Sequence, residues 1–175
     1  NKLNISSSYL MPGAPYGGSC LPKDLAALNS MSKKQGLSSP LLGSIAESNK
    51  NFYEKLVNNV KVFVKDDQFL IHGISFKNGT DDIRNSPGFN LAIDLLKDNY
   101  KFHWFDQDIL DTLNEYGFES AFFTQFPLDL LDLMVSDPIK LLDNKEYKIV
   151  ITKSLCKNNH LEQGYKQNKI FYFSI

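Results

Sequence analysis

Cysteine, net charge and long apolar runs are all scarce in this sequence of 175 residues. Its two cysteines, Cys20 and Cys156, are far apart, which fits neither a disulfide framework nor the paired spacing of a zinc site. We therefore expect no metal site. The 19 basic and 20 acidic side chains leave a net charge of −1, so bulk electrostatics recruits neither nucleic acid nor an anionic membrane.

No apolar run approaches the roughly 20 residues that a membrane-spanning helix needs. The first residues also lack the basic-then-apolar layout of a secretory signal, so we expect a cytoplasmic protein without a membrane partner. The sequence begins at Asn1 rather than at methionine, which suggests a cut fragment or a processed product. Its 42% of hydrophobic residues is ordinary for a chain that buries a core in one or two domains.

Two helices are predicted before any strand. Pro22 suits the first position of a helix, and Lys33, Lys34 and Gly36 provide stop signals, so we expect a helix over 22–34. Apolar residues at three- and four-residue steps predict a second helix from Pro40 to about residue 65. That helix would be about 37 Å long at 1.5 Å per residue. Since a chain of this size needs less for its own core, we expect the helix to join two domains or to pair with a second subunit.

Strands and helices alternate in the rest of the chain. Apolar runs of strand length lie at 69–76, 101–105, 147–152 and 170–173, and helical patterns lie at 86–97 and 128–135. This alternation predicts an α/β fold whose parallel sheet carries helices on both faces.

Cys20 is the first candidate for chemistry. It lies just ahead of the helix that starts near Pro22, so its sulfur should face the positive end of the helix dipole, with Lys23 close by. Gly17 and Gly18 would leave room for a ligand. These conditions favour a nucleophilic thiolate. A single cysteine can equally be a small buried apolar residue, and spacing alone does not decide between the two.

A second candidate is the segment 76–87, which leaves a predicted strand and enters a helix. Ligands of open α/β sheets bind at that edge, where Lys77 and Arg84 could meet phosphate oxygens beside a helix N-terminus. The alternative is a solvated loop in which Asp81 and Asp82 balance the two bases. The segment lacks the Gly-x-Gly-x-x-Gly spacing, so we do not interpret it as a dinucleotide fingerprint.

Three runs together resemble the UDP-glucose/GDP-mannose 6-dehydrogenase family, and most nearly its GDP-mannose branch. They are YLMPG at 9–13, GGSCLPKDLAAL at 17–28 and GISFKNGTDDIRNSP at 73–87. The resemblance covers residues 5 to about 106 in the family's order. It implies that 1–66 is a remnant of the central helical domain, with the catalytic cysteine and a long helix that forms a homodimer. It also implies that 67–175 is a C-terminal, Rossmann-like domain that binds a sugar nucleotide.

The resemblance further implies an NAD-dependent, two-step oxidation of the C6 alcohol of a nucleotide sugar, such as GDP-mannose or a UDP-sugar, to a carboxylate. Cys20 would attack the intermediate aldehyde, and the thiohemiacetal would become a thioester that water hydrolyses with help from Asp24. Lys23 and Arg84 would contact NAD, and Lys77 would contact the sugar nucleotide. The other substrate-holding positions would be Tyr9, Leu10, Met11, Pro12, Gly13 and Gly17.

Two departures from the family pattern keep alternatives open. The GDP-mannose branch usually has an arginine where Met11 stands and a phenylalanine where Ala14 stands, so the sugar and nucleotide preferences stay open. The family's Gly-rich NAD domain is absent from this sequence, so we expect this chain alone to be inactive. The alternatives are a dimerising module that binds sugar nucleotide without chemistry and a degenerate paralogue.

Overall fold

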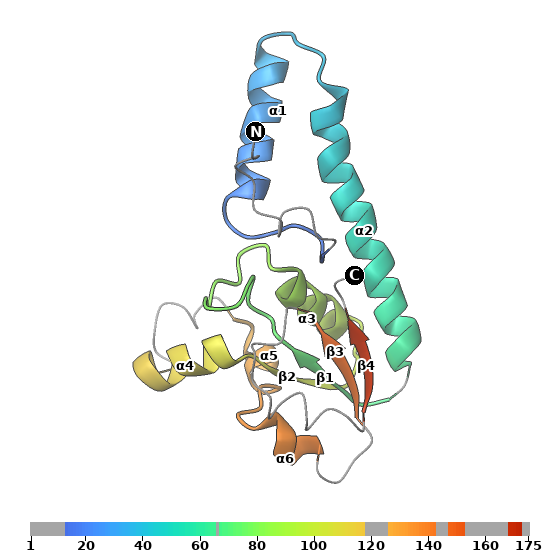
Figure 1. Cartoon of the computed structure of the whole chain (residues 1–175), viewed down its shortest axis with the longest axis vertical. Helices are drawn as coiled ribbons and strands as arrows, with labels where there is room; N and C mark the ends of the chain where they lie inside the picture. The colour runs from blue at the N-terminus through green and yellow to red at the C-terminus, as the bar shows by residue number, and fades with distance from the viewer. Residues whose placement is uncertain (1–12, 66, 118–125, 143–146, 153–167, 173–175) are drawn as a thin grey trace, which may run out of the picture.

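The structure is a computed structural model that describes residues 13–65, 67–117, 126–142, 147–152 and 168–172. A helical hairpin, made of α1 (Leu21–Lys34) and α2 (Pro40–Val64), stands on an α/β layer that contains the rest of the described chain (Figure 1). Both predicted helices are confirmed, and α1 begins one residue earlier than predicted. Pro22 lies in its first turn, where a missing N–H costs nothing, and Asp24 and the basic pair at 33–34 suit the two ends of the helix dipole.

The α/β layer contains a fully parallel sheet with the strand order β2-β1-β3-β4. Its strands are β1 (Phe69–His72), β2 (Phe102–Phe105), β3 (Lys148–Ile151) and β4 (Lys169–Tyr172). The chain first moves from β1 to β2 and then returns to the other side of β1. The carboxyl end of β1 is therefore a topological switch point, where α/β sheets bind their ligands.

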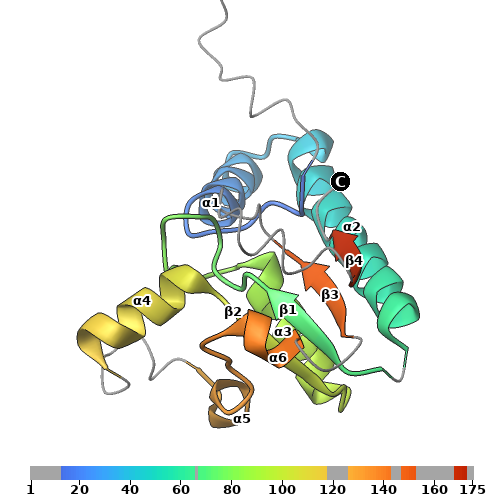
Figure 2. The same cartoon turned by 60° about the horizontal axis from the view of Figure 1, so that its bottom comes forward.

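Helices cover both faces of the sheet, as predicted (Figure 2). On one face, the second half of α2 and α3 (Pro87–Lys97) pack with α5 (Leu128–Leu131) against Phe69, Ile71 and Trp104. On the other face, α4 (Gln107–Tyr116) and α6 (Pro138–Leu142) pack against the alternate strand residues, among them Leu70 and Ile149. Successive side chains of a strand point to opposite faces, so four-residue strands suffice to serve both clusters.

The first strand is shorter than the predicted run of 69–76. It ends at His72 because Gly73 turns the chain with φ 87°, a conformation that glycine adopts readily. The next two N–H groups, of Ile74 and Ser75, donate to the carboxylate of Asp106 at 2.8 Å each instead of to a neighbouring strand. A side chain from the end of β2 thus ends β1.

The predicted helix over 128–135 is also wrong in its second half. Helix α5 ends at Leu131, and the chain then runs beside β2, where Trp104 N–H donates to Leu133 and Val135 N–H donates to Trp104. The indole N–H of the buried Trp104 donates to the Leu130 carbonyl at 2.6 Å. This segment thus provides hydrogen-bond partners for the backbone of Trp104 at the outer edge of β2. Sequence periodicity does not reveal such a pairing.

Helix α2 is attached to the sheet layer along its second half. Its buried residues, Leu56, Val57, Val60 and Val64, all lie there. Two polar contacts join this half to α3 and to the residue that caps its end: Tyr53 donates to Asp94 at 2.7 Å, and Lys61 pairs with Asp98 at 2.6 Å. Burial and the hydrogen bond to Asp94 raise the pKa of Tyr53. The first half of α2 and all of α1 project beyond the sheet (Figure 1).

Candidate functional site

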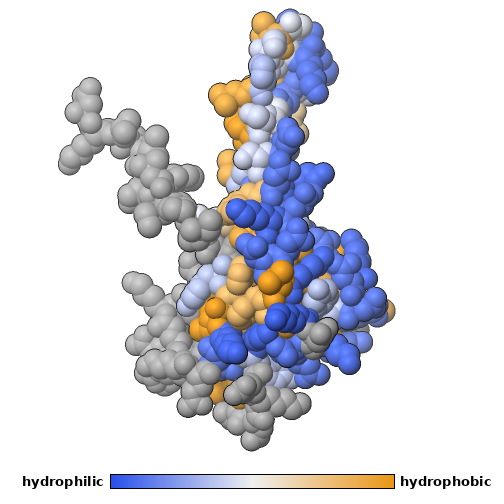
Figure 3. Space-filling view, turned by 90° about the vertical axis from the view of Figure 1, so that its right-hand side faces the viewer, coloured by the Kyte–Doolittle hydropathy of each residue, from blue (hydrophilic) through white to orange (hydrophobic). Residues whose placement is uncertain are grey.

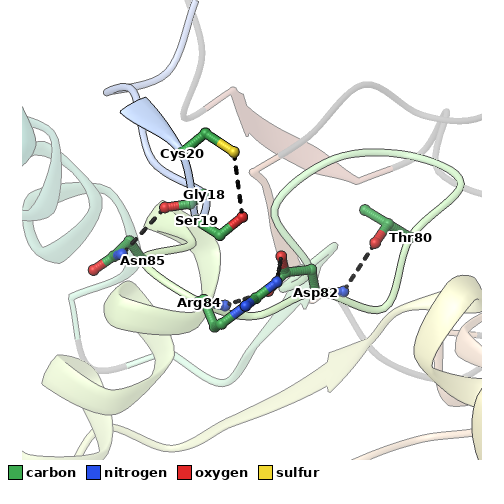
Figure 4. A network of polar contacts seen from close by, with 7 residues as sticks. All are labelled: Gly18, Ser19, Cys20, Thr80, Asp82, Arg84 and Asn85. Carbon is green, nitrogen blue, oxygen red and sulfur yellow. Dashed lines mark hydrogen bonds and ion pairs between the residues drawn. The ribbon is translucent and has the colours of Figure 1, made fainter. Parts of the chain in front are cut away.

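The two sequence segments that carry the candidate residues meet at the base of the hairpin. Residues 13–20 lead into α1, and residues 73–86 leave the carboxyl end of β1. The side-chain amide of Asn85 donates to the Gly18 carbonyl at 3.1 Å, across 67 positions of sequence (Figure 4). The two segments with the candidate residues therefore meet near the carboxyl end of β1.

Gly17 and Gly18 make this close approach possible. A methyl group on Gly17 would overlap the Asn85 carbonyl oxygen and come within 3.1 Å of Pro87. Gly18 has φ 80°, and a methyl group there would come within 2.7 Å of the Phe76 ring. Both glycines are buried. The expectation that they leave room for a ligand is wrong in this respect, because the neighbouring loop fills the space.

Cys20 is exposed and occupies the N-cap position of α1. Its side chain makes no capping hydrogen bond, and its sulfur lies 3.8 Å from the Ser19 hydroxyl oxygen. Exposure excludes the alternative of a buried, merely apolar cysteine. The thiol faces solvent beside the first N–H groups of a helix, which carry partial positive charge.

Asp24 and Lys23 follow Cys20 in the first turn of α1. Asp24 N–H donates to the Cys20 carbonyl at 2.9 Å, so the two residues are one turn apart and share a face of the helix. Lys23 lies 3.5 Å from the Asp24 carboxylate, and both side chains are about two-thirds or more exposed, at 73% and 67%. Such an exposed pair holds neither group rigidly, which leaves both available to a ligand.

Arg84 lies close to Cys20 and is held by Asp82 (Figure 4). Its Nε and Nη2 atoms donate to the two Asp82 carboxylate oxygens at 2.9 Å each, and its backbone N–H donates to the same carboxylate. The hydrogen bonds from Arg84 hold the pKa of Asp82 below its ordinary value. The same pairing raises the pKa of Arg84. The guanidinium is thus fixed in direction while the Arg84 side chain stays 65% exposed.

The loop 76–84 has a defined shape and is tied to α4. Asp82 N–H donates to Thr80 at 3.1 Å, and Phe76 N–H donates to the Asp82 carbonyl at 2.7 Å. Thr112 of α4 donates to Asp81 at 3.1 Å. Asp81 and Asp82 thus have different partners, and only Asp82 balances a base of the loop. Lys77 is exposed on this loop.

Asp106 shapes the turn that follows β1, a role that the sequence did not reveal. It is 1% exposed, and one carboxylate oxygen accepts from Ile74 and Ser75 while the other accepts from Asp108 N–H at 3.1 Å. In dinucleotide-binding sheets the turn after the first strand offers its N–H groups to phosphate. Here a carboxylate already occupies these groups. The signal in the sequence is an acidic residue that both ends a strand and caps the next helix.

A second missed residue is Asn49 of α2. Its side-chain oxygen accepts from Tyr16 N–H at 2.8 Å, and its amide donates to the Tyr16 carbonyl at 3.0 Å. Tyr16 also lines an apolar groove of about 370 Å³ between the two hairpin helices, together with Asp24 and Leu25. The groove opens beside the first turn of α1, where Asp24 is its one charged lining residue among those described.

Not every predicted site residue is described. Tyr9, Leu10, Met11 and Pro12 lie outside the described residues. Gly13 is half-buried, and a methyl group there would meet no atom within 4 Å. Over the described ranges there is no cluster of three or more metal-ligating side chains, and no helix that is long and apolar enough to cross a membrane.

The model of the UDP-glucose/GDP-mannose dehydrogenase family, central domain, matches residues 1–51. GDP-mannose 6-dehydrogenase of Pseudomonas aeruginosa is 39% identical over 109 residues, which are 62% of this chain and 25% of that protein. UDP-glucose 6-dehydrogenase of Rickettsia bellii is 34% identical over 96 residues, which are 53% of this chain and 22% of that protein. The chain thus spans about a quarter of the length of the curated relatives it matches.

Solved structures agree with these matches. A ternary complex of GDP-mannose dehydrogenase from Pseudomonas aeruginosa has a TM-score of 0.79 and 28% identity, and covers 98% of this chain and 39% of that chain. UDP-glucose dehydrogenase from Pyrobaculum islandicum has a TM-score of 0.67 and covers 91% of this chain and 34% of that chain. At 22% identity, the second match shows the fold alone.

Proposed function

From the membership of this chain in the UDP-glucose/GDP-mannose dehydrogenase family, we propose that it is part of an NAD-dependent nucleotide-sugar 6-dehydrogenase. The reaction would be the cytoplasmic oxidation of the C6 alcohol of GDP-mannose or a UDP-sugar to a carboxylate. The observation that carries this proposal is the exposed Cys20 at the start of α1, which faces a loop that carries Lys77 and Arg84.

Cys20 has the position that a nucleophile needs. Its thiolate attacks the C6 aldehyde and forms a C–S bond, while the carbonyl oxygen takes a proton and becomes the hydroxyl of a thiohemiacetal. Loss of hydride from C6 and of the hydroxyl proton leaves a thioester. Water then attacks the thioester carbonyl and the C–S bond breaks. This releases the sugar carboxylate and returns Cys20 to the thiolate form. Asp24, one turn after Cys20 on the same helix face, accepts a proton from that water.

NAD, when bound, accepts the hydride in each oxidation. The diphosphate of NAD carries two negative charges. Lys23 and Arg84 are exposed cations near Cys20 that fit these charges, and Asp82 fixes the direction of the Arg84 side chain. The N–H groups after β1 do not fit this role, because the Asp106 carboxylate would repel a phosphate. We therefore assign cofactor contacts to Lys23 and Arg84 and sugar-nucleotide contact to Lys77 and to Gly13 in the segment that precedes α1, but not to the buried Gly17.

The test is Cys20→Ser in the full-length protein, with acid formation from GDP-mannose and from UDP-glucose followed by chromatography. A serine hydroxyl is a far weaker nucleophile than a thiolate, so we expect no acid, with nucleotide-sugar binding within threefold of the unchanged protein by calorimetry. Cys156→Ser is the matched control and should form acid at the original rate. Full acid formation by Cys20→Ser would refute the mechanism.

The second candidate function is a dimerising, sugar-nucleotide-binding module without chemistry. The hairpin favours the dimer, because its apolar side chains gather along one side and are well exposed (Figure 3). The exposed apolar residues of the hairpin include Met31, Leu37 and Leu41, which are 62%, 65% and 73% exposed. A patch of this kind commonly marks a protein interface. If this second function is correct, the full-length protein binds the nucleotide sugar but forms no acid, and Cys20→Ser changes neither result.

A further inference from the structure

Two asparagine side chains hold the segment that carries Cys20 from opposite sides. On one side, Asn49 of α2 exchanges two hydrogen bonds with the backbone of Tyr16, at 2.8 and 3.0 Å. On the other side, Asn85 donates to the Gly18 carbonyl at 3.1 Å (Figure 4). Asn49 thus ties the segment to the long helix, and Asn85 ties it to the loop that leaves β1.

The backbone of Asn85 serves the same contact as its side chain. It has φ 52°, a left-handed conformation that asparagine tolerates better than most residues other than glycine. This turn brings its carbonyl oxygen against Gly17, where a methyl group would not fit. Asn85 therefore touches both glycines ahead of Cys20, one through its main chain and one through its side-chain amide.

We infer that Asn85 is a positioning residue that sets the place of the Cys20 thiol relative to the loop of Lys77 and Arg84. The inference rests on the proposed function in so far as Cys20 is the nucleophile. The nucleophile and the charges that face it belong to segments far apart in the sequence, so a contact between the segments must fix their separation. A misplacement of about 1 Å can lower a reaction rate about a hundredfold.

Two substitutions separate the side-chain contact from the backbone conformation. Asn85→Gly keeps the left-handed turn at no steric cost and removes the amide donor. Asn85→Asp keeps the size and tolerance of the turn but points a carboxylate at the Gly18 carbonyl oxygen, so the donor is replaced by repulsion. A purely conformational role predicts that Asn85→Gly behaves as the original protein. The positioning role predicts that both variants lose the contact.

The matched control is Asn99, which also has a left-handed backbone, with φ 61°. It is exposed in the turn between α3 and β2, so it lies at the amino edge of the sheet, opposite the site. Asn99→Gly and Asn99→Asp make the same chemical changes, including the same added charge, away from Cys20.

The experiment uses the full-length protein and two readouts. Amide hydrogen exchange in residues 16–21 should quicken by about two- to tenfold in both Asn85 variants, the factor that corresponds to one net hydrogen bond, and stay unchanged in both Asn99 variants. With GDP-mannose or UDP-glucose, whichever the unchanged protein oxidises, kcat should fall at least tenfold in the Asn85 variants while KM changes less than threefold.

Unchanged exchange in Asn85→Gly would overturn the inference, as would an equal change in the Asn99 variants. A KM effect without loss of kcat would also overturn it, because the thiol would then be correctly placed. If neither the variants nor the unchanged protein form acid from GDP-mannose or from UDP-glucose while the exchange pattern is as expected, the positioning contact stands and the proposed function fails.

Discussion

Replacement of Asp106 by alanine should be among the most damaging single changes in the described part of this chain. The carboxylate is 1% exposed and accepts from three backbone N–H groups, at 2.8, 2.8 and 3.1 Å. Two of these donors belong to Ile74 and Ser75, which are 0% and 2% exposed, so water does not replace the lost acceptor without rearrangement. Each buried donor left without a partner costs about 1–3 kcal/mol. The lost helix cap of α4 costs about 1 kcal/mol more.

We therefore expect Asp106→Ala to lower the free energy of unfolding by about 3–7 kcal/mol. Asp108→Ala is the matched control. Its carboxylate accepts from Gly79 N–H at 3.1 Å in an exposed place, so its loss should cost less than about 1 kcal/mol. Asp106→Asn should lie between the two, because an amide oxygen can still accept from Ile74 and Ser75 while the amide nitrogen opposes the N–H of Asp108.

Urea unfolding, followed by tryptophan fluorescence of the buried Trp104, measures these differences as shifts in the midpoint at an unchanged slope. A loss of less than about 1 kcal/mol in Asp106→Ala would refute the reasoning, since it would mean that the two strand-end donors find other acceptors at little cost. A loss equal to that of Asp108→Ala would refute it equally.

Two further predictions concern charge and assembly. The pKa of Asp82 is depressed, so the carboxylate contributes its stabilisation above the ordinary value of about 3.9 and loses it as pH falls through the lower folded value. A carboxyl-carbon NMR titration of Asp82 should give a midpoint below about 3.9, and Arg84→Gln should return that midpoint to the ordinary range. A midpoint that Arg84→Gln leaves unchanged would contradict the pairing of Arg84 with Asp82. For assembly, Leu41→Glu on the exposed face of α2 should convert a dimer to a monomer in sedimentation velocity, whereas Leu128→Glu on α5, 78% exposed, should not. A full-length protein that is monomeric before any change would disprove the proposed dimer.

The helices of this fold could be predicted because their signals are local. Pro40 and the three- and four-residue apolar steps define α2 almost to the residue, and Ser86 with Pro87 defines the start of α3. Ser86 accepts from Phe89 N–H, a capping bond between near neighbours in sequence. Such signals need no knowledge of the rest of the chain.

The ends of β1 and α5 could not be predicted because distant residues set them. The carboxylate that takes the N–H groups after β1 is 31 and 32 positions away, and the residues after α5 leave the helix to bond to Trp104. The candidate site divides in the same way. The family resemblance implied that Cys20 and Arg84 belong to one site, but Asn85, which joins their two segments, carries no signal of its own in the sequence.

The attachment of α2 has a mechanical consequence for the thiol. Tyr53 and Lys61 bind the second half of the helix to α3 and to its C-cap residue. Among the described residues the first half has no such contact with α3, so we treat it as a rod that tilts about Tyr53, which serves as the fulcrum. Asn49, which holds the cysteine segment, is about 6 Å from that fulcrum along the axis, whereas the tip at Pro40 is about 20 Å away. A tilt that moves the tip by about 3 Å therefore moves Asn49 by about 1 Å. The tip of the hairpin can therefore move about three times as far as the Asn49 contact that holds the segment of Cys20.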